Sequence, residues 1–355
     1  MRYPQFLKPG GTIGFVAPSF GCNIEPYKSA FLNAQNKWKE MGYGIDIGPN
    51  CYEGKGIGIS NTPEACSEEL TGYYCSDNND CLISCGGGEL MCETLCHVDF
   101  EKIKEAEPKW YLGYSDNTNM TFLLATLCDV ASVYGPCAAA FGMEPWHPAM
   151  ADTFALLCGE KNTFASYELW EKEGLKDEDH PLLPYHCTEK TQVKIFMPKE
   201  ANAASKAIEA QEVQTAKAEG RLLGGCMDCL VNLTGTKFDR VKEFAEKYKE
   251  DGILWFLESC DLNVFSIRRA MWQMEQAGWF RHVKGFIIGR PLNGEEMMGL
   301  NRYDAVLACA SKYGVPVFMD VDLGHLPPAM PFVTGSYAKV EGKDKKLQIS
   351  LEFRG

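Results

Sequence analysis

Strand-like and helix-like segments alternate over the first 130 residues of the chain. Short apolar runs that end in Gly, Pro or Ser indicate buried strands, and they cover residues 12–19, 43–48, 80–88 and 110–115. Between them, apolar residues recur at helical spacing over residues 27–42, 61–76 and 117–130. This order predicts a parallel sheet with helices on both faces. Ligand sites of such sheets collect at the carboxyl ends of the strands.

The second half repeats the alternation after an irregular middle segment. Apolar strands are predicted at residues 252–260, 283–292 and 315–325, helices at 267–280 and 302–314, and an edge strand at 346–355. With 355 residues the chain is long enough for two domains. We therefore predict an N-terminal domain over residues 1–165, an interdomain excursion over 166–220 with a helical piece in 200–220, and a C-terminal domain over 221–355.

Charge and composition narrow the classes of function. The formal net charge of −13 argues against binding to nucleic acid or to an anionic membrane surface. The N-terminal residues lack the apolar core of a signal peptide, and no stretch reaches ~18 consecutive apolar residues. We therefore expect a cytoplasmic protein without a membrane span. Its sixteen cysteines are then interpreted as free thiols in a reducing compartment.

The cysteine spacing does not predict a metal site. Cys226 and Cys229 form one C-x-x-C pair, but a structural zinc site needs a second pair, and no histidine pair stands near the first. We interpret the cysteines as small buried side chains and predict neither a metal nor a cofactor.

Three polar residues each follow an apolar strand: Ser115, Glu258 and His325. A serine hydroxyl becomes a good nucleophile when a base removes its proton, and an imidazole does this near neutral pH. A carboxylate on the second ring nitrogen fixes the tautomer and stabilises the imidazolium. These residue types therefore form the set that acyl transfer requires, if the fold brings them together.

Each of the three has an alternative interpretation. Ser115 opens the run Ser-Asp-Asn-Thr, all good helix caps, so it can be a cap, a nucleophile or both. Glu258 can be a solvated acid at a strand end. His325 can be a loop histidine, although it alone among six histidines follows a long buried strand and a glycine.

A glycine-rich turn, "SCGGGEL", covers residues 84–90. Glycines permit close approach of the backbone, so these amides can receive an oxyanion or a phosphate. The turn does not match a Walker phosphate loop, and Gly86, Gly87 and Gly88 lack the later glycine of a dinucleotide fingerprint. A tight packing turn is the alternative.

The motifs, taken in order, resemble the LD-carboxypeptidase family of serine peptidases. This family includes the murein tetrapeptide carboxypeptidases and the hydrolases that give self-immunity to microcin C. The resemblance extends from about residue 8 to residue 340 and rests on eight motifs: "KPGGTIGFVAPS", "ISCGGGE", "GYSDNT", "VYGP", "EGRLLGG…LTGT", "ILWFLE", "VKGFIIG" and "VPVFMDVDLGH".

The resemblance implies an N-terminal parallel α/β sandwich, a C-terminal mixed β/α domain of barrel-like character, and a site between them. Family members are commonly homodimers. By motif, Ser115 matches the nucleophile, Glu258 the triad acid and His325 the base. The oxyanion hole would consist of backbone amides of Asp116 and of Gly87 or Gly88. At the position of Cys226 many relatives have Asn, so this sequence departs from the family pattern there.

The resemblance leads to a prediction of function. We expect a serine hydrolase that cleaves an amide next to a free carboxylate, with murein tetrapeptide as substrate and terminal D-Ala as product. A microcin-type aminoacyl-nucleotide is the alternative substrate, and a non-catalytic anion-binding α/β protein is the alternative of another class. Arg290 is a candidate for holding the substrate carboxylate, with a surface salt bridge as its alternative, and Trp170 is a candidate for stacking on a base.

Overall fold

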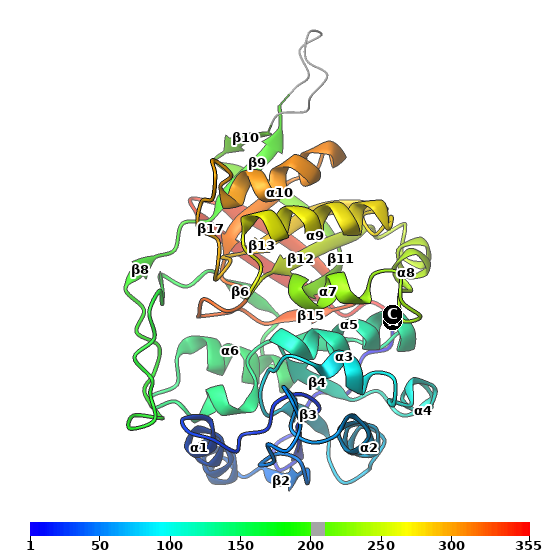
Figure 1. Cartoon of the computed structure of the whole chain (residues 1–355), viewed down its shortest axis with the longest axis vertical. Coiled ribbons are helices and arrows are strands. Elements are labelled where there is room, and N and C mark those ends of the chain that lie inside the picture. Colours follow the sequence, from blue (N-terminus) through cyan, green and yellow to red (C-terminus); the bar gives the residue numbers. More distant parts are fainter. Residues whose placement is uncertain (200–209) are drawn as a thin grey trace.

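The computed structural model describes residues 1–199 and 210–355. The N-terminal half forms one lobe and most of the C-terminal half forms a second lobe, each built around its own sheet (Figure 1). Helices lie between and around the two sheets. The predicted α/β class and the parallel sheet of the first half are confirmed.

The N-terminal sheet has the strand order β15-β5-β4-β3-β1-β2. Its strands are β1 (Thr12–Val16), β2 (Gly44–Ile47), β3 (Cys81–Ser84), β4 (Trp110–Gly113), β5 (Ser132–Tyr134) and β15 (Phe332–Thr334). The first five are parallel to their neighbours, and β15 pairs antiparallel with β5. Strands β3 and β4 are buried along their whole length, as their apolar runs predict.

The N-terminal lobe contains α1 (Tyr27–Glu40), α2 (Pro63–Tyr74), α3 (Met91–Thr94), α4 (Phe100–Glu105), α5 (Thr118–Cys128) and α6 (Pro148–Leu157), with 3₁₀ turns η1 (Ser115–Asn117) and η2 (Ala138–Gly142). Helix α2 begins where the sequence indicates a start, because the Thr62 side chain accepts the Ala65 N–H and Pro63 stands in the first turn. Helix α5 is buried on nearly all sides, since it lies between the two sheets (Figure 1).

The C-terminal sheet has the order β10-β9-β14-β13-β12-β11-β16-β17-β6. Its strands are β6 (Thr163–Ala165), β9 (Lys194–Pro198), β10 (Ala210–Val213), β11 (Thr215–Cys226), β12 (Ile253–Glu258), β13 (Val283–Gly289), β14 (Val317–Val321), β16 (Tyr337–Lys343) and β17 (Lys346–Glu352). Strands β11 to β14 run parallel and the flanking strands pair antiparallel, so the sheet is mixed, as expected. In the described part of the chain its end strands β10 and β6 do not pair, so the barrel-like character does not extend to a closed barrel.

Helices α7 (Met227–Leu233), α8 (Val241–Lys247), α9 (Val264–Gln276) and α10 (Arg302–Ala310), with the 3₁₀ turn η3 (Ser311–Tyr313), complete the C-terminal lobe. A two-stranded ribbon of β7 (Leu169–Trp170) and β8 (Glu189–Lys190) belongs to the irregular middle segment. None of the helices in residues 1–199 and 210–355 combines the length and the apolar character that crossing a bilayer needs.

The structure corrects two expectations about strands and leaves others as predictions. The last strand, β17, is not an edge strand, because it lies between β16 and β6. Residues 200–209, part of the expected helical piece, lie outside the described residues, and residues 210–213 form β10 rather than a helix. The sheets also exchange strands along the chain, since β15 joins the N-terminal sheet and β6 the C-terminal sheet. The domain boundaries at residues 165 and 220 stay a prediction.

Glycine at position 142 allows η2 to pack directly on the backbone of helix α1. A Cβ at Gly142 would lie 1.9 Å from the carbonyl oxygen of Ala30, in the first turn of α1. Because a backbone atom cannot move aside as a flexible side chain does, any larger residue must separate the two elements.

We expect Gly142→Ala to lower the free energy of unfolding by about 1–3 kcal/mol, the usual cost of overpacking. Gly72 in α2 is the matched control, since a Cβ there meets nothing within 4 Å. Gly72→Ala should leave stability equal or raise it by about 0.5–1 kcal/mol, because alanine restricts the unfolded chain and favours helix. Urea denaturation compares the two. Equal shifts in the same direction would contradict this account of the packing.

Candidate active site

Ser115, His325 and Glu258 lie in one hydrogen-bonded chain. The Nε2 atom of His325 is 2.9 Å from the Ser115 Oγ, and its Nδ1 atom is 2.8 Å from the Glu258 Oε2. Ser115 follows β4, Glu258 ends β12 and His325 follows β14, so the chain joins the carboxyl ends of strands from both sheets. The fold thus brings together all three residues that the sequence singled out.

Ser115 is held on a sharp turn between a strand and a helix. Its φ of 62° lies in the left-handed region, which costs a serine on the order of 1–2 kcal/mol. Its backbone N–H donates to the Tyr134 hydroxyl at 3.2 Å. Its side chain does not cap a helix, since neither η1 nor α5 has a side-chain cap bond. The expected cap role of Ser115 is therefore wrong, and its hydroxyl is directed to His325 instead.

The Asp116 carboxylate holds the turn that carries Ser115 in place through three hydrogen bonds. It accepts the Ser19 hydroxyl at 2.5 Å, the Met91 backbone N–H at 2.8 Å and the Asn119 amide at 2.9 Å. Burial raises the pKa of Asp116, while these hydrogen bonds lower it, and burial has the larger effect. This side chain ties the loop after β1 and the start of α3 to the turn that carries Ser115.

The glycine turn lies directly against the Ser115 side chain. A Cβ on Gly87 would come within 3.1 Å of the Ser115 Oγ, and one on Gly88 would collide with the Ser19 Oγ at 2.0 Å. The turn is held by the Asn117 amide, which donates to the Gly86 carbonyl at 2.8 Å. At Gly88 there is no room for a side chain, and at Gly87 a side chain would press on Ser115, so the Gly87 backbone lies directly against the serine hydroxyl.

Glu258 is completely buried, and each of its two carboxylate oxygens has a hydrogen-bond partner. One oxygen faces His325, and the other accepts the Tyr134 hydroxyl at 2.5 Å. Burial raises the pKa of Glu258, but the imidazole and the hydrogen bonds outweigh it, so the pKa lies below its ordinary value. For His325, burial is the largest single effect and lowers the pKa, but the charge and hydrogen bond of Glu258 together with the Cys260 thiol outweigh it, and the net pKa is well above the usual range.

Sequence reasoning missed Tyr134, which joins two members of this chain. It ends β5, and its hydroxyl contacts both the Ser115 N–H and the Glu258 carboxylate. The signal was present, since Tyr134 precedes the Gly-Pro of the "VYGP" motif at a strand end. Nothing in the residue type showed that its hydroxyl would reach across to the other sheet.

Cys226 lies beside the triad-like chain. Its Sγ, a carboxylate oxygen of Glu258 and a ring nitrogen of His325 all lie within 4.8 Å of one another, close enough to share a metal ion. Glu258 and His325 are already bonded to each other, so a metal ion there would have to displace that hydrogen bond. A hydrogen bond that the Cys226 thiol donates to Cys229, together with burial, raises the pKa of Cys226 and keeps it protonated.

Two cavities flank the hydrogen-bonded chain. One, of about 80 Å³, is lined by His325 and by aromatic and proline side chains, among them Tyr114 and Tyr185. The other, of about 330 Å³, is lined by Ser115, by the glycine turn and by acidic and thiol side chains. A substrate bound over Ser115 therefore meets an apolar wall on one side and an acidic wall on the other.

Arg290 and Trp170 contact each other but not the triad-like chain. The Arg290 guanidinium bonds the Asp322 carboxylate at 2.5 Å and lies 4.9 Å from the Trp170 ring. Both residues line a separate cavity of about 230 Å³ that contains neither Ser115 nor His325. The structure therefore does not bring these two candidates to the serine.

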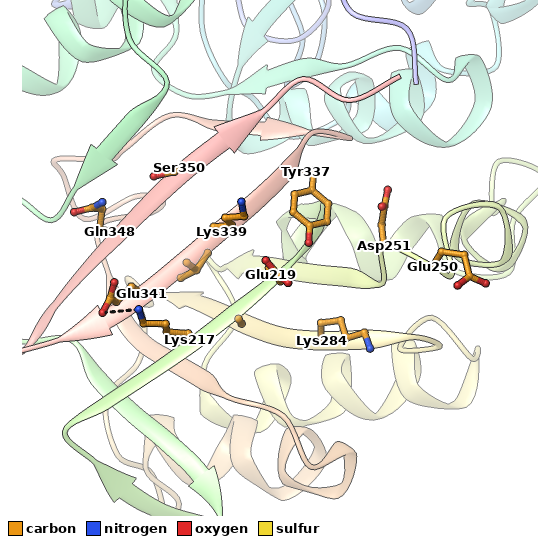
Figure 2. A pocket seen from close by; sticks show the side chains of 12 residues that line it. Lys217, Glu219, Glu250, Asp251, Lys284, Tyr337, Lys339, Glu341, Gln348 and Ser350 are labelled. Atoms are coloured by element: carbon orange, nitrogen blue, oxygen red, sulfur yellow. Dashed lines mark ion pairs between the residues drawn. The ribbon is translucent and has the colours of Figure 1, made fainter.

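A further cavity, of about 730 Å³, lies on the face of the C-terminal sheet formed by β11, β16 and β17 (Figure 2). Side chains of both charges line it, and one pair of them, Lys217 and Glu341, forms an ion pair at 3.3 Å. Triad residues do not line it. We assign it no ligand.

Both halves of the chain are similar to known proteins. The family model of the LD-carboxypeptidase N-terminal domain matches residues 13–135, and that of the C-terminal domain matches residues 219–340. A probable murein peptide carboxypeptidase of Bacillus subtilis is 23% identical, covering 98% of this chain and 93% of its own. The microcin C7 self-immunity protein MccF of Escherichia coli is 22% identical, covering 98% and 95%.

Solved structures share the fold over the whole length. An MccF-like protein from Bacillus anthracis superimposes with a TM-score of 0.79 at 21% identity, covering 100% of both chains. The structure of MccF in complex with glutamyl sulfamoyl guanosine has a TM-score of 0.77 at 18% identity, covering 99% of both chains. Both domain models, in their expected order, together match more than half of the described sequence, and the chain belongs to the LD-carboxypeptidase family.

Proposed function

We propose that this protein is a serine hydrolase in which Ser115 is the nucleophile, His325 the general base and Glu258 the group that orients and charges the base. The observation that carries the proposal is the unbroken hydrogen-bonded chain at 2.9 and 2.8 Å. It supplies a nucleophile and a base within reach of each other and a buried carboxylate behind the base. A non-catalytic binding protein would have no need for this arrangement.

The proposed reaction begins when His325 Nε2 takes the proton of the Ser115 hydroxyl as the oxygen attacks the substrate carbonyl. Glu258 keeps the Nδ1 proton in place and stabilises the imidazolium that forms. His325 then gives the proton to the leaving amine, which departs as the acyl-enzyme forms. A water molecule, activated by the same base, hydrolyses the ester and restores Ser115.

We propose that the developing oxyanion is stabilised by backbone amides of Asp116 and of the turn at Gly87 and Gly88. Asp116 directly follows the nucleophile at the start of η1 and α5, where the helix dipole favours negative charge. Gly87 lies against the Ser115 hydroxyl. The left-handed turn at Ser115 supports the proposal, because it lifts the hydroxyl out of the sheet.

For the substrate, we propose a murein tetrapeptide cleaved to release terminal D-Ala, an LD-carboxypeptidase activity. Family membership supports this, as does the relative named as a murein peptide carboxypeptidase. Action in the recycling of peptidoglycan in the cytoplasm and assembly as a homodimer belong to the same proposal. No cofactor takes part in the proposed steps.

A second candidate is an aminoacyl-nucleotide of the microcin type. The observation that favours it is the solved relative that holds glutamyl sulfamoyl guanosine. In this chain Tyr114 and Tyr185 are among the aromatic side chains that line the cavity next to His325. Trp170 stacks on Arg290 instead, so stacking on a nucleobase would fall to the tyrosines.

Replacement of the nucleophile tests the mechanism. We expect Ser115→Ala to lower kcat/KM for tetrapeptide hydrolysis by roughly 10⁴–10⁶-fold, because the remaining groups cannot form the acyl-enzyme. Mass spectrometry of released D-Ala measures the rate. Ser350→Ala, at the distant surface cavity of Figure 2, is the matched control and should retain full activity. Substantial hydrolysis by a folded Ser115→Ala variant would disprove the nucleophile.

The pH profile tests the pairing of His325 with Glu258. Only the neutral imidazole accepts the serine proton, and its pKa is raised, so kcat/KM should fall toward acid with a midpoint above the ordinary histidine value of about 6.5. In Glu258→Gln the charge that raises this pKa is gone while burial still lowers it. The acidic midpoint should therefore move to lower pH, with a rate reduced about 10⁴-fold. An unchanged midpoint would mean that Glu258 does not set the pKa of the base.

A further inference from the structure

The cavity of about 330 Å³ beside Ser115, here called the acceptor cavity, is lined by four carboxylates from four different segments of the chain. They are Glu89 after β3, Asp116 in η1, Asp228 in α7 and Asp261 after β12. No lysine or arginine lines this cavity within residues 1–199 and 210–355. Its electrostatic potential is therefore negative, and it faces the proposed nucleophile.

Two of these carboxylates accept hydrogen bonds from other groups of the protein, and two do not. Asp116 holds the nucleophile turn, and Asp228 accepts the backbone N–H groups of Cys260 at 3.1 Å and Asp261 at 2.8 Å. The side chains of Glu89 and Asp261 are exposed, and neither carboxylate has a hydrogen-bond or ion-pair partner among the described residues. Partial burial, and then the charges of Asp261, Asp116 and Asp228, raise the pKa of Glu89.

A buried amide oxygen adds a third acceptor without a donor. Asn119 lines the acceptor cavity and is 1% exposed. Its Nδ2 donates to the Asp116 carbonyl and carboxylate, both at 2.9 Å, whereas its Oδ1 has no hydrogen-bond partner. A buried acceptor that lacks a donor costs about 1–3 kcal/mol, so this atom indicates a ligand that donates hydrogen bonds.

Four cysteines line the cavity: Cys92, Cys226, Cys229 and Cys260. The pKa of the first three thiols is raised, so these three add no negative charge near pH 7. The four carboxylates also do not form a group close enough to share one metal ion, in the part of the chain that the structure describes. The fitting ligand is therefore an organic cation whose several N–H groups reach separate acceptors.

We propose that the acceptor cavity binds an ammonium group of the substrate, carried by the side chain of a residue next to the scissile bond. Glu89 and Asp261 supply the charge, and Asn119 Oδ1 supplies a neutral acceptor. The proposal rests on the hydrolase function above and specifies its substrate class. It also sets the orientation of the peptide, because a terminal carboxylate is repelled here and must lie toward the aromatic cavity beside Tyr114 and Tyr185.

The experiment compares two tetrapeptides that differ only in one charge: L-Ala-γ-D-Glu-L-Lys-D-Ala and the same peptide with the lysine Nε acetylated. We expect kcat/KM to be about tenfold higher for the peptide with the ammonium, the effect of two partly exposed ion pairs. High salt should reduce this preference. The double variant Glu89→Gln/Asp261→Asn should bring the ratio close to one. Glu160→Gln, at an exposed site outside the cavity, is the control and should keep the preference.

A binding measurement tests this inference separately from the proposed function. Calorimetry measures both peptides against the Ser115→Ala variant, which is expected to bind without turnover. Preferential binding of the ammonium peptide without hydrolysis by the parent protein would refute the tetrapeptide hydrolase and keep the inference. Equal binding, no binding, or a preference that survives in the double variant would overturn the inference, whatever the hydrolysis shows.

Discussion

The buried carboxylate of Glu258 is the group on which the geometry of the site depends. An ionised side chain with no exposed surface is tolerated only when it is paired and hydrogen-bonded. Its two oxygens take partners from different parts of the chain, Tyr134 at the end of β5 and His325 after β14. Gly324, with a φ of 99°, leaves the space that the carboxylate fills, since a Cβ there would collide with Glu258.

The hydrogen bonds that Glu258 accepts also help to hold the two lobes together. Tyr134 belongs to the N-terminal sheet and Glu258 to the C-terminal sheet, so their 2.5 Å hydrogen bond crosses between the lobes. Helix α5 adds an apolar contact, because Phe122 packs on Trp279 with a ring separation of 5.4 Å. The sharp turn at Ser115 is stable in this setting, since its N–H bonds the same tyrosine and Asp116 anchors it from below. The same contacts therefore position the serine and hold the two lobes together.

The sequence predicted what depends on local pattern and missed what depends on contacts between lobes. The strand ends carrying Ser115, Glu258 and His325 could be found because apolar runs stop at those residues. Tyr134 could not, since a tyrosine at a strand end is equally a core residue. Arg290 also follows a strand, yet the buried Asp322 holds it away from the serine. Short strands far from their partners, such as β15, have no local signal of the sheet they join.

In the proposed mechanism, the buried charge of Glu258 acts through His325 to make the Ser115 hydroxyl a nucleophile. Reaction with a fluorophosphonate probe, followed by peptide mapping, measures that nucleophilicity without any assumption about the substrate. We expect a single phosphonylated serine at position 115, with labelling slowed by several orders of magnitude in His325→Ala because the serine then keeps its proton. Labelling that is equally fast in His325→Ala, or a Ser115 that stays unmodified in the parent protein, would contradict it.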